Sequence, residues 1–291
     1  MKFTKMQAYG NDYIYISLFD QTMDNHSAWA RYVSHRRFGV GSDGMVLICP
    51  SEVADFRMRI FNPDGSEAEM CGNALRSTGM YVYEKGLTDQ TDFTVETIGG
   101  IKKIFLDVEN GKVKNITAAI GAPILNPSLI PVNCDSSRVN ALGIKVKALD
   151  KEFVLNAISL GNPHCVVFVD DAFNFPIDKY GIAIEKHPVF PKGANVEFVE
   201  IVDENNLRMR TWERNCGETL ACATGCSAAT VCGYLCGKCS NETTVHQLGG
   251  DIGIKYNTDE DCIYMTGRSW FVFDGTVDDN AYKELFLHEA E

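Results

Sequence analysis

The sequence predicts an α+β protein with two pseudo-symmetric, mostly antiparallel β domains, each folded around one principal helix. The first observation is an internal repeat, because adding 151 to the numbers of Arg57–Arg59 and Cys71 gives Arg208–Arg210 and Cys222. Apolar and polar residues also alternate in many short segments, as in half-buried strands. Finally, one segment of each half has helical spacing at the same place in the repeat. The other matched pairs are Gly10-Asn11 with Gly161-Asn162, Asp20 with Asp171, Glu67 with Glu218, Tyr83 with Tyr234, and Gly86 with Gly237.

The repeat divides the 291 residues into two domains of ordinary size. Pro123, Pro127 and Pro131 cluster where we expect the chain to cross from one domain to the other. The predicted N-terminal domain comprises residues 1–120 and 268–291 and carries Cys71. The predicted C-terminal domain comprises residues 121–267 and carries Cys222.

The first half is expected to contain seven strands and two helices. Ser27–Arg37 has helical spacing, with Ser27 as the predicted N-cap. Gly72–Glu84 is also helical, and Gly86 suits the position after a helix end. Alternation and turn signals place the strands at 2–6, 13–18, 45–48, 56–61, 92–97, 102–108 and 112–120.

The second half reuses this order. Ala223–Leu235 is the predicted principal helix, with Gly237 after its end. Strands are expected at 153–158, 165–169, 196–202, 207–212, 243–247, 253–256, 262–265 and 270–273. We expect the final strand to return to the first domain.

Composition limits the classes of function. With 27 basic and 39 acidic residues the net charge is −12, which argues against a nucleic-acid partner. The sequence contains no run of about 18 apolar residues, so no membrane span is expected. The N-terminus also lacks the apolar core of a signal peptide. Eleven cysteines without such a signal indicate free thiols in a reducing compartment, so we expect a cytoplasmic protein. A small-molecule partner is expected, and a homodimer is left open.

Cys71 and Cys222 each directly precede a predicted helix that begins with small residues. A helix N-terminus carries unpaired N–H groups and partial positive charge. Such a position is expected to lower a thiol pKa and to bind carboxylates. Taken singly, each cysteine is more often an ordinary buried residue. Duplication at two helix starts favours a functional pair.

Two matched thiols would suit inversion at a carbon centre. A thiolate on one face can remove the weakly acidic α-proton of an amino acid, and a thiol on the other face can return one. If the two halves pack about a pseudo-two-fold axis, the sulfurs would face each other across a site between the domains. This chemistry requires neither a metal nor a pyridoxal cofactor, and we expect none.

The chain resembles the diaminopimelate epimerase family over nearly its whole length. The motifs that carry the resemblance, in order, are Tyr9–Tyr13, Phe38–Gly44, Arg59–Glu67, Met70–Arg76, Gly161-Asn162-Pro163-His164, Asn195, Trp212-Glu213-Arg214, Gly217-Glu218-Thr219 and Ala221–Gly225. The resemblance implies the α+β fold with two similar domains. It also implies a cofactor-independent isomerase that interconverts LL- and meso-2,6-diaminopimelate in the synthesis of lysine and peptidoglycan precursors.

The resemblance also implies roles for individual residues. Cys222 would be the base and Cys71 the acid for the LL substrate, with the roles reversed for the return reaction. N–H groups at Gly72, Asn73, Ala223 and Thr224 would hold the reacting carboxylate. His164 and Glu213 would tune the thiols. The remaining substrate contacts would come from Asn11, Asn62, Asn162, Asn195, Arg214 and the backbone of Glu213.

Four residues depart from the family pattern. Ala223 stands where glycine is usual, Cys226 stands where alanine is usual, and Cys216 stands where a small residue is common. Gly44 stands where some members carry a substrate-contacting glutamine, so that role is not transferred. These departures bear on specificity rather than on the type of reaction.

Two alternative functions remain open. One is a racemase or epimerase of the same superfamily that acts on another amino acid. The other is an iron–sulfur or thiol-redox protein, because Cys232, Cys236 and Cys239 have the C-x3-C-x2-C spacing of some cluster-binding enzymes. The repeat places these cysteines at a helix end, which favours ordinary structural thiols.

Overall fold

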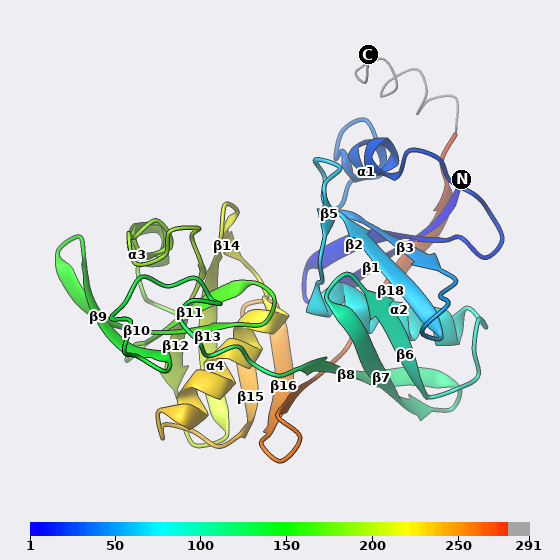
Figure 1. The fold of residues 1–291 in the computed structure, drawn as a ribbon. Coiled ribbons are helices and arrows are strands. Elements are labelled where there is room, and N and C mark those ends of the chain that lie inside the picture. The colour runs from blue at the N-terminus through cyan, green and yellow to red at the C-terminus, as the bar shows by residue number, and fades with distance from the viewer. Residues whose placement is uncertain (279–291) are drawn as a thin grey trace. The chain divides into compact units, whose positions relative to one another are not determined.

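The computed structural model describes residues 1–278, which divide into two compact units. The first comprises Met1–Ala118 and resumes at Arg268, and the second comprises Ala119–Gly267. The break after Ala118 lies two residues before the predicted one. Residues 279–291, which the prediction included in the first domain, lie outside the described part. Figure 1 shows that each unit consists of strands packed against helices.

The first unit contains helices α1 (His26–Ser34) and α2 (Gly72–Glu84). Its strands are β1 (Lys2–Ala8), β2 (Asn11–Ser17), β3 (Met45–Cys49), β4 (Phe56–Phe61), β5 (Glu67–Ala68), β6 (Asp92–Thr97), β7 (Gly100–Glu109), β8 (Lys112–Gly121) and β18 (Trp270–Thr276). The last of these comes from the far end of the chain and pairs antiparallel with β1.

The second unit contains helices α3 (Ile177–Glu185) and α4 (Ala223–Leu235). Its strands are β9 (Ala141–Ala148), β10 (Lys151–Ser159), β11 (Pro163–Phe168), β12 (Asn195–Ile201), β13 (Asn206–Glu213), β14 (Gly217–Thr219), β15 (Glu242–Gln247), β16 (Gly250–Asn257) and β17 (Cys262–Gly267). The predicted α+β fold with two similar halves is confirmed.

The internal repeat is visible in the pairing of the strands. In the first unit β2 pairs parallel with β3, and β4 pairs parallel with β6. In the second unit β11 pairs parallel with β12, and β13 pairs parallel with β15. Helices α2 and α4 have 13 residues each and begin 151 positions apart. At the edge of the first unit's sheet, β18 pairs antiparallel with β1. In the second unit β9 pairs antiparallel with β10 in the equivalent way.

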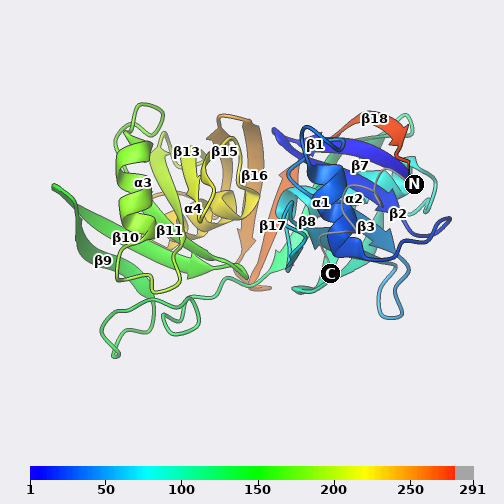
Figure 2. The same ribbon diagram turned by 90° about the horizontal axis from the view of Figure 1, so that it is seen from above.

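In the second unit, successive residues of a strand face opposite sides of the sheet, and a different helix covers each side. Cys165, Val196 and Phe198 pack with Ile177 and Ile184 of α3 in one apolar cluster. Residues that alternate with them lie on the opposite face of the sheet, where α4 packs against β11 and β12 (Figures 1 and 2). Helix α4 is buried from Ala223 to Gly233, which its small alanine, glycine, serine and cysteine side chains permit.

Three helical details differ from the prediction, and the first is that α1 ends at Ser34 rather than at Arg37. Helix α1 begins after Asn25, whose side chain accepts the Ala28 N–H at 3.2 Å, so Ser27 is not the N-cap. Each unit also has a second helix, and α3 was not predicted. The glycines expected after the principal helices are confirmed, since Gly86 and Gly237 have φ of 73° and 66°.

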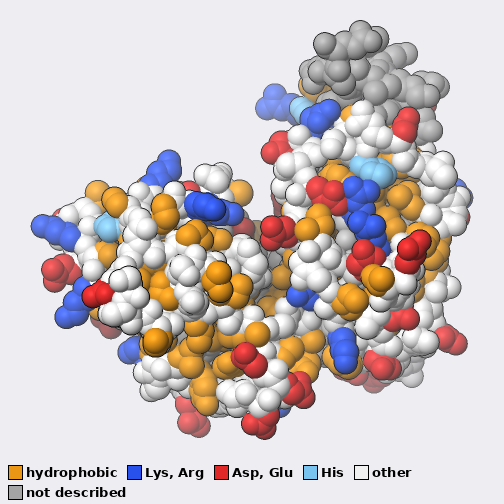
Figure 3. Space-filling model, viewed as in Figure 1, with side chains coloured by type: hydrophobic (Ala, Val, Ile, Leu, Met, Phe, Trp, Pro, Cys, Tyr) orange, Lys and Arg blue, Asp and Glu red, His pale blue; other side chains and the backbone are white. Residues whose placement is uncertain are grey.

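No helix among residues 1–278 is both long and apolar enough to cross a membrane. On the face drawn in Figure 3, basic and acidic side chains are interspersed over each unit.

Candidate active site

Cys71 occupies the N-cap position of α2, with extended backbone angles of φ −137° and ψ 121°. Its thiol donates to the Asn11 Oδ1 at 3.7 Å, and the same oxygen accepts from Asn73 Nδ2 at 3.2 Å. The first residue of β2 and the first turn of α2 therefore meet at the sulfur.

A buried cation and an acid fix the amides around Cys71. The fully buried Arg76 donates from Nη2 to Asn73 Oδ1 at 2.6 Å. On the other side Asn11 donates from Nδ2 to Asp43 Oδ2 at 2.9 Å. Because both amides are fixed by charged partners, the Asn11 oxygen stays directed at the thiol. The family motif included Arg76, but sequence reasoning gave it no role.

Tyr13 is a second neighbour of Cys71 that sequence reasoning missed. Its ring is buried, and burial together with the adjacent Cys71 thiol raises the pKa of Tyr13 well above 10. The phenol is therefore a neutral hydrogen-bonding group at neutral pH.

Cys222 occupies the matching N-cap position, before α4 in the second unit. Its sulfur accepts the Gly225 N–H at 3.4 Å and lies 3.5 Å from Thr224 Oγ1. The Cys222 N–H donates to Gln247 Oε1 at 2.7 Å, which holds the start of the helix against β15.

The expected lowering of the thiol pKa is wrong for Cys222. Burial raises the pKa of this thiol well above 9, and the carboxylates of Glu213 and Glu197 raise it further. Hydrogen bonds from Thr224 and Gly225 act in the opposite direction, as expected for a helix N-terminus, but they do not offset the burial. Cys222 is therefore a thiol at neutral pH in the absence of substrate.

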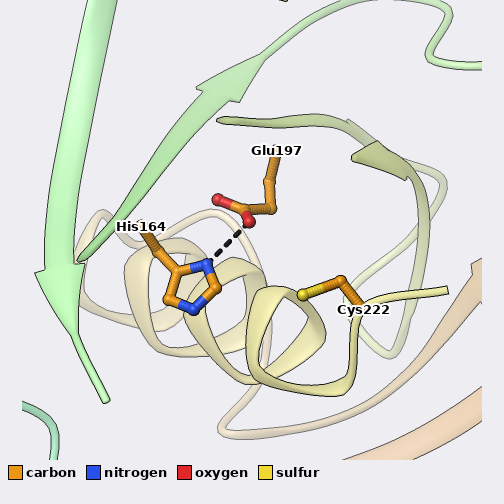
Figure 4. A group of neighbouring side chains, drawn as sticks. All are labelled: His164, Glu197 and Cys222. Atoms are coloured by element: carbon orange, nitrogen blue, oxygen red, sulfur yellow. Dashed lines mark hydrogen bonds and ion pairs between the residues drawn. The ribbon is translucent and has the colours of Figure 1, made fainter. Parts of the chain in front are cut away.

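His164, Glu197 and Cys222 form a buried group, drawn in Figure 4, whose functional atoms lie within 4.8 Å of one another. His164 Nδ1 and Glu197 Oε1 are 2.7 Å apart, and neither side chain is exposed. Two ligands of one zinc ion would be separated by about 3.3 Å, so the shorter contact is that of a hydrogen-bonded pair. Glu197 was not predicted. The feature of the sequence that could have indicated Glu197 is a charged residue between the apolar residues Val196 and Phe198.

The other predicted residues of the second unit lie around this group. Asn162 Oδ1 is 3.0 Å from His164 Nε2. Asn195 donates to the Pro163 carbonyl at 3.1 Å and accepts the Arg214 N–H at 2.9 Å. Glu213 accepts from Thr219 Oγ1 at 2.7 Å.

Some predicted positions are less directly connected to a cysteine. Asn62 donates to Ser66 Oγ at 3.0 Å, within its own turn.

Gly44 is required by packing, because a Cβ there would lie 2.4 Å from the Phe61 carbonyl oxygen. Of the departures from the family pattern, Cys226 is buried inside α4 and Cys216 is exposed.

Two of the cysteines at the end of α4 contact strand β10. Among residues 1–278, the only group of three potential ligands with mutually close atoms is His164, Glu197 and Cys222. The thiols of Cys232 and Cys236 instead donate to the backbone and side-chain oxygens of Asn156, at 3.8 and 3.5 Å. These contacts are those of structural thiols packed against β10.

Comparison with known proteins identifies what the chain is similar to. A family model described as diaminopimelate epimerase matches residues 3–125 and 156–272. The diaminopimelate epimerase of Acetivibrio thermocellus is 49% identical over 280 residues, covering 96% of this chain and 99% of that protein. The enzyme of the same name from Methanococcus maripaludis strain C5 is 46% identical over 278 residues, covering 96% and 100%.

Solved structures share the fold at low sequence identity. A probable proline racemase from Agrobacterium radiobacter K84 superposes with a TM-score of 0.69 at 15% identity, covering 98% of this chain and 97% of that chain. A PhzF-family phenazine biosynthesis protein from Bacillus anthracis gives 0.66 at 19% identity, covering 96% and 99%.

Proposed function

The chain belongs to the diaminopimelate epimerase family, and from this premise we propose that it interconverts LL- and meso-2,6-diaminopimelate by a two-base mechanism. The observation that carries the mechanism is the pair of N-cap cysteines, Cys71 and Cys222, at equivalent positions of the two repeats. The enzyme is an isomerase of lysine and peptidoglycan precursor synthesis.

In the LL-to-meso direction, the thiolate of Cys222 takes the α-proton, and the electron pair stays on carbon next to the carboxylate. Cys71 then donates its thiol proton to the opposite face, which leaves Cys71 as the thiolate and inverts the centre. The raised pKa of Cys222 makes its thiolate scarce at neutral pH but strongly basic, which suits a weak carbon acid.

Substrate recognition uses both carboxylate ends of diaminopimelate. The first-turn N–H groups at Gly72, Asn73, Ala223 and Thr224 would stabilise charge that develops on the reacting carboxylate. Asn11, Asn62, Asn162, Asn195, Arg214 and the Glu213 backbone would hold the rest of the substrate. A guanidinium can bind a carboxylate through two parallel hydrogen bonds, which suits Arg214 to the distal end.

The test is α-hydrogen exchange from D2O into LL- and meso-diaminopimelate by the wild type and by Cys71→Ala and Cys222→Ala. We expect each variant to lose epimerisation by about 10²- to 10⁴-fold while still binding substrate, because this is the factor that a positioned base or acid supplies. Turnover by either variant near the wild-type rate would exclude the two-base mechanism. Exchange into another amino acid at a higher rate than into diaminopimelate would instead favour a different substrate.

The location of the enzyme follows from its thiols. All eleven cysteines lie in the described part of the chain and are thiols rather than disulfides, including the exposed Cys216 and Cys236. We therefore infer that the enzyme works in the reducing cytoplasm, where such thiols persist.

A further inference from the structure

Glu185 is the last residue of helix α3 and is almost completely buried, with 4% of its surface exposed. Both features are unfavourable for an acidic side chain. The C-terminus of a helix carries partial negative charge, and burial removes the water that solvates a carboxyl group. The stability of α3 therefore does not account for an acid at this position, whereas the hydrogen bonds of Glu185 do.

The two carboxyl oxygens of Glu185 bind the chain on both sides of Arg214. Oε2 accepts the indole N–H of Trp212 at 2.8 Å, and Oε1 accepts the backbone N–H of Asn215 at 3.1 Å. An indole N–H and a backbone N–H can only donate, so the direction of both hydrogen bonds is fixed. Trp212 lies two residues before Arg214 and Asn215 lies one residue after it. Glu185 thus holds the segment that carries Arg214 from both ends.

The segment that Glu185 holds is the turn between β13 and β14. Glu213 pairs with Gly217 across this turn, and Asn215 within it has left-handed backbone with φ of 63°. Inside the turn the Cys216 N–H donates to the Glu213 carbonyl at 3.1 Å. Helix α3 packs against both β13 and β14 (Figure 1). The end of α3 is therefore close enough to support the turn from the side.

The equivalent turn of the first unit, Asn62–Ser66, is closed by its own residues. The Asn62 N–H donates to the Ser66 carbonyl at 2.8 Å, and Asp64 Oδ1 accepts the Ser66 N–H at 2.8 Å. An offset of 151 gives the counterparts, which are Arg214 for Pro63, Asn215 for Asp64 and Gly217 for Ser66. The turn with the arginine lacks the aspartate and the serine that close the other turn, and Glu185 supplies an acceptor in their place.

Arg214 itself lies along the segment that follows α3. Its backbone N–H donates to Asn195 Oδ1 at 2.9 Å, and its Nη1 donates to the Lys192 carbonyl at 3.3 Å. The stem of the side chain passes over Gly193, where a Cβ would lie 3.2 Å from Arg214 Cδ. The position of the guanidinium therefore depends on how firmly the turn is held against α3 and the residues after it.

We infer that Glu185 is a positioning residue that fixes Arg214 for a second carboxylate of the substrate. The inference rests on the proposed function, in which Arg214 binds the distal end of diaminopimelate. A guanidinium makes two parallel hydrogen bonds to a carboxylate only when its plane is correctly placed, so a fixed backbone on both sides favours binding. Glu185 does not touch the substrate, and it acts through Trp212 and Asn215.

Glutamine at position 185 would keep the shape of the side chain but would satisfy only one of the two donors. Its amide has one oxygen that accepts and one NH2 group that donates. Either the Trp212 N–H or the Asn215 N–H would then face another donor and lose its partner. The turn becomes less firmly held as a result, and the affinity for a dicarboxylate falls while proton transfer at the α-carbon continues.

The first experiment reads these two hydrogen bonds directly by NMR of the full chain labelled with 15N. In the wild type we expect slow exchange with solvent of the Asn215 amide, although this residue lies in an exposed turn. In Glu185→Gln the Asn215 amide or the Trp212 indole N–H should exchange at least about tenfold faster. Fast exchange of the Asn215 amide in the wild type would overturn the inference, even if the variant failed to fold. Unchanged exchange of both groups in a folded variant would also overturn it.

The second experiment measures steady-state kinetics with LL-diaminopimelate. We expect Glu185→Gln to raise KM about tenfold, the size of one hydrogen bond to a charged group, with a smaller change in kcat. Asp178→Asn is the matched control, because Asp178 is an exposed acid on the same helix. A fall in kcat with unchanged KM would overturn the inference, since a merely structural role lowers the amount of active enzyme and leaves KM unchanged.

A double-mutant cycle tests whether the effect passes through Arg214. In an Arg214→Ala background, Glu185→Gln should add little to the KM, because no guanidinium remains to be positioned. An undiminished tenfold rise there would contradict the inference. Failure of the proposed function would show differently, as absence of α-hydrogen exchange into diaminopimelate by the wild type. The exchange of the Asn215 amide and the Trp212 indole would then still follow the expected pattern.

Discussion

Cys222 shows how neighbours from distant strands determine the chemistry of one residue. The sequence predicted its position before a helix, and the sulfur does accept the Gly225 N–H. The direction of the pKa shift depends also on burial and on Glu213 and Glu197. Glu197 reaches the site through the pairing of β11 with β12, and a single sequence does not reveal that register. The helix position was therefore predictable, but the electrostatic balance was not.

Replacing Glu213 with glutamine is expected to lower the pKa of Cys222, because Glu213 is the largest charged contribution after burial. Alkylation of Cys222 by iodoacetamide at pH 8 should then become faster, on the order of tenfold for a shift of one pKa unit. Mass spectrometry of the peptide that contains Cys222, over a range of pH, measures this rate. Glu204→Gln, in an exposed turn, is the control, and an unchanged rate in Glu213→Gln would contradict the assignment.

The helices differ in how readily their sequences indicate them. The limits of α2 and α4 were predicted because each has an uninterrupted helical pattern and a following glycine with positive φ. Helix α3 was missed because it is short, follows Pro176 and contains Gly181 near its centre. Gly181 is needed for packing, since a Cβ there would lie 2.6 Å from the Trp212 ring. The repeat offset, applied to α1, was the signal that could have located α3.

Gly181→Ala should destabilise the protein although alanine favours helices. The gain in propensity is about 1 kcal/mol, and forcing a methyl group into a packed ring costs about 1–3 kcal/mol. Urea unfolding should therefore show a lower free energy of unfolding. In a Trp212→Ala background the same change should be neutral or stabilising, and a loss of stability there would mean that the ring is not the cause.

A strand-to-strand ion pair gives an element-scale prediction for pH. Arg59 on β4 donates to both oxygens of Glu67 on β5, at 2.7 and 2.9 Å, and these hydrogen bonds lower the pKa of Glu67 below 4.5. A carboxyl whose pKa is lower in the folded state stabilises above its unfolded pKa and loses this contribution as the pH falls through the folded value.

We expect Glu67→Gln to lower the free energy of unfolding by about 1 kcal/mol at pH 7. The difference between variant and wild type should shrink below pH 4.5, as the wild-type carboxyl becomes protonated. Denaturant titrations at several pH values measure this, with Glu109→Gln on an exposed strand end as the control. A difference that is constant down to pH 3 would show that charge is not responsible.

At the scale of the whole molecule, the repeat of 151 residues predicted more than composition did. It identified two similar units and the matched cysteines, because a duplicated chain folds into equivalent local structures. Tyr13 and Glu197 were not assigned roles, since each acts through contacts between segments that are distant in sequence. Arg76 was not assigned a role either, although its partner Asn73 lies only three residues away.

The discontinuous first unit depends on close packing between its two chain segments. Gly275 on β18 lies over Phe3 on β1, and a Cβ at Gly275 would come within 2.5 Å of the ring. Gly275→Ala is expected to destabilise this unit by about 1–3 kcal/mol. Hydrogen exchange should then be faster in β1 and β2 but unchanged in β15 and β16. Gly253→Ala, where contacts are an ordinary 3.7 Å, is the control, and uniform acceleration would show that the two units unfold together.

The pairing of Trp270–Thr276 with Lys2–Ala8 also constrains synthesis on the ribosome. Residues Ala119–Gly267 emerge as one uninterrupted stretch and can complete their unit as soon as they leave the exit tunnel. The segment Met1–Ala118, although made earlier, retains an open sheet edge until Trp270–Thr276 has also left the ribosome. Of the two units, the one whose first segment is made earlier is therefore completed later.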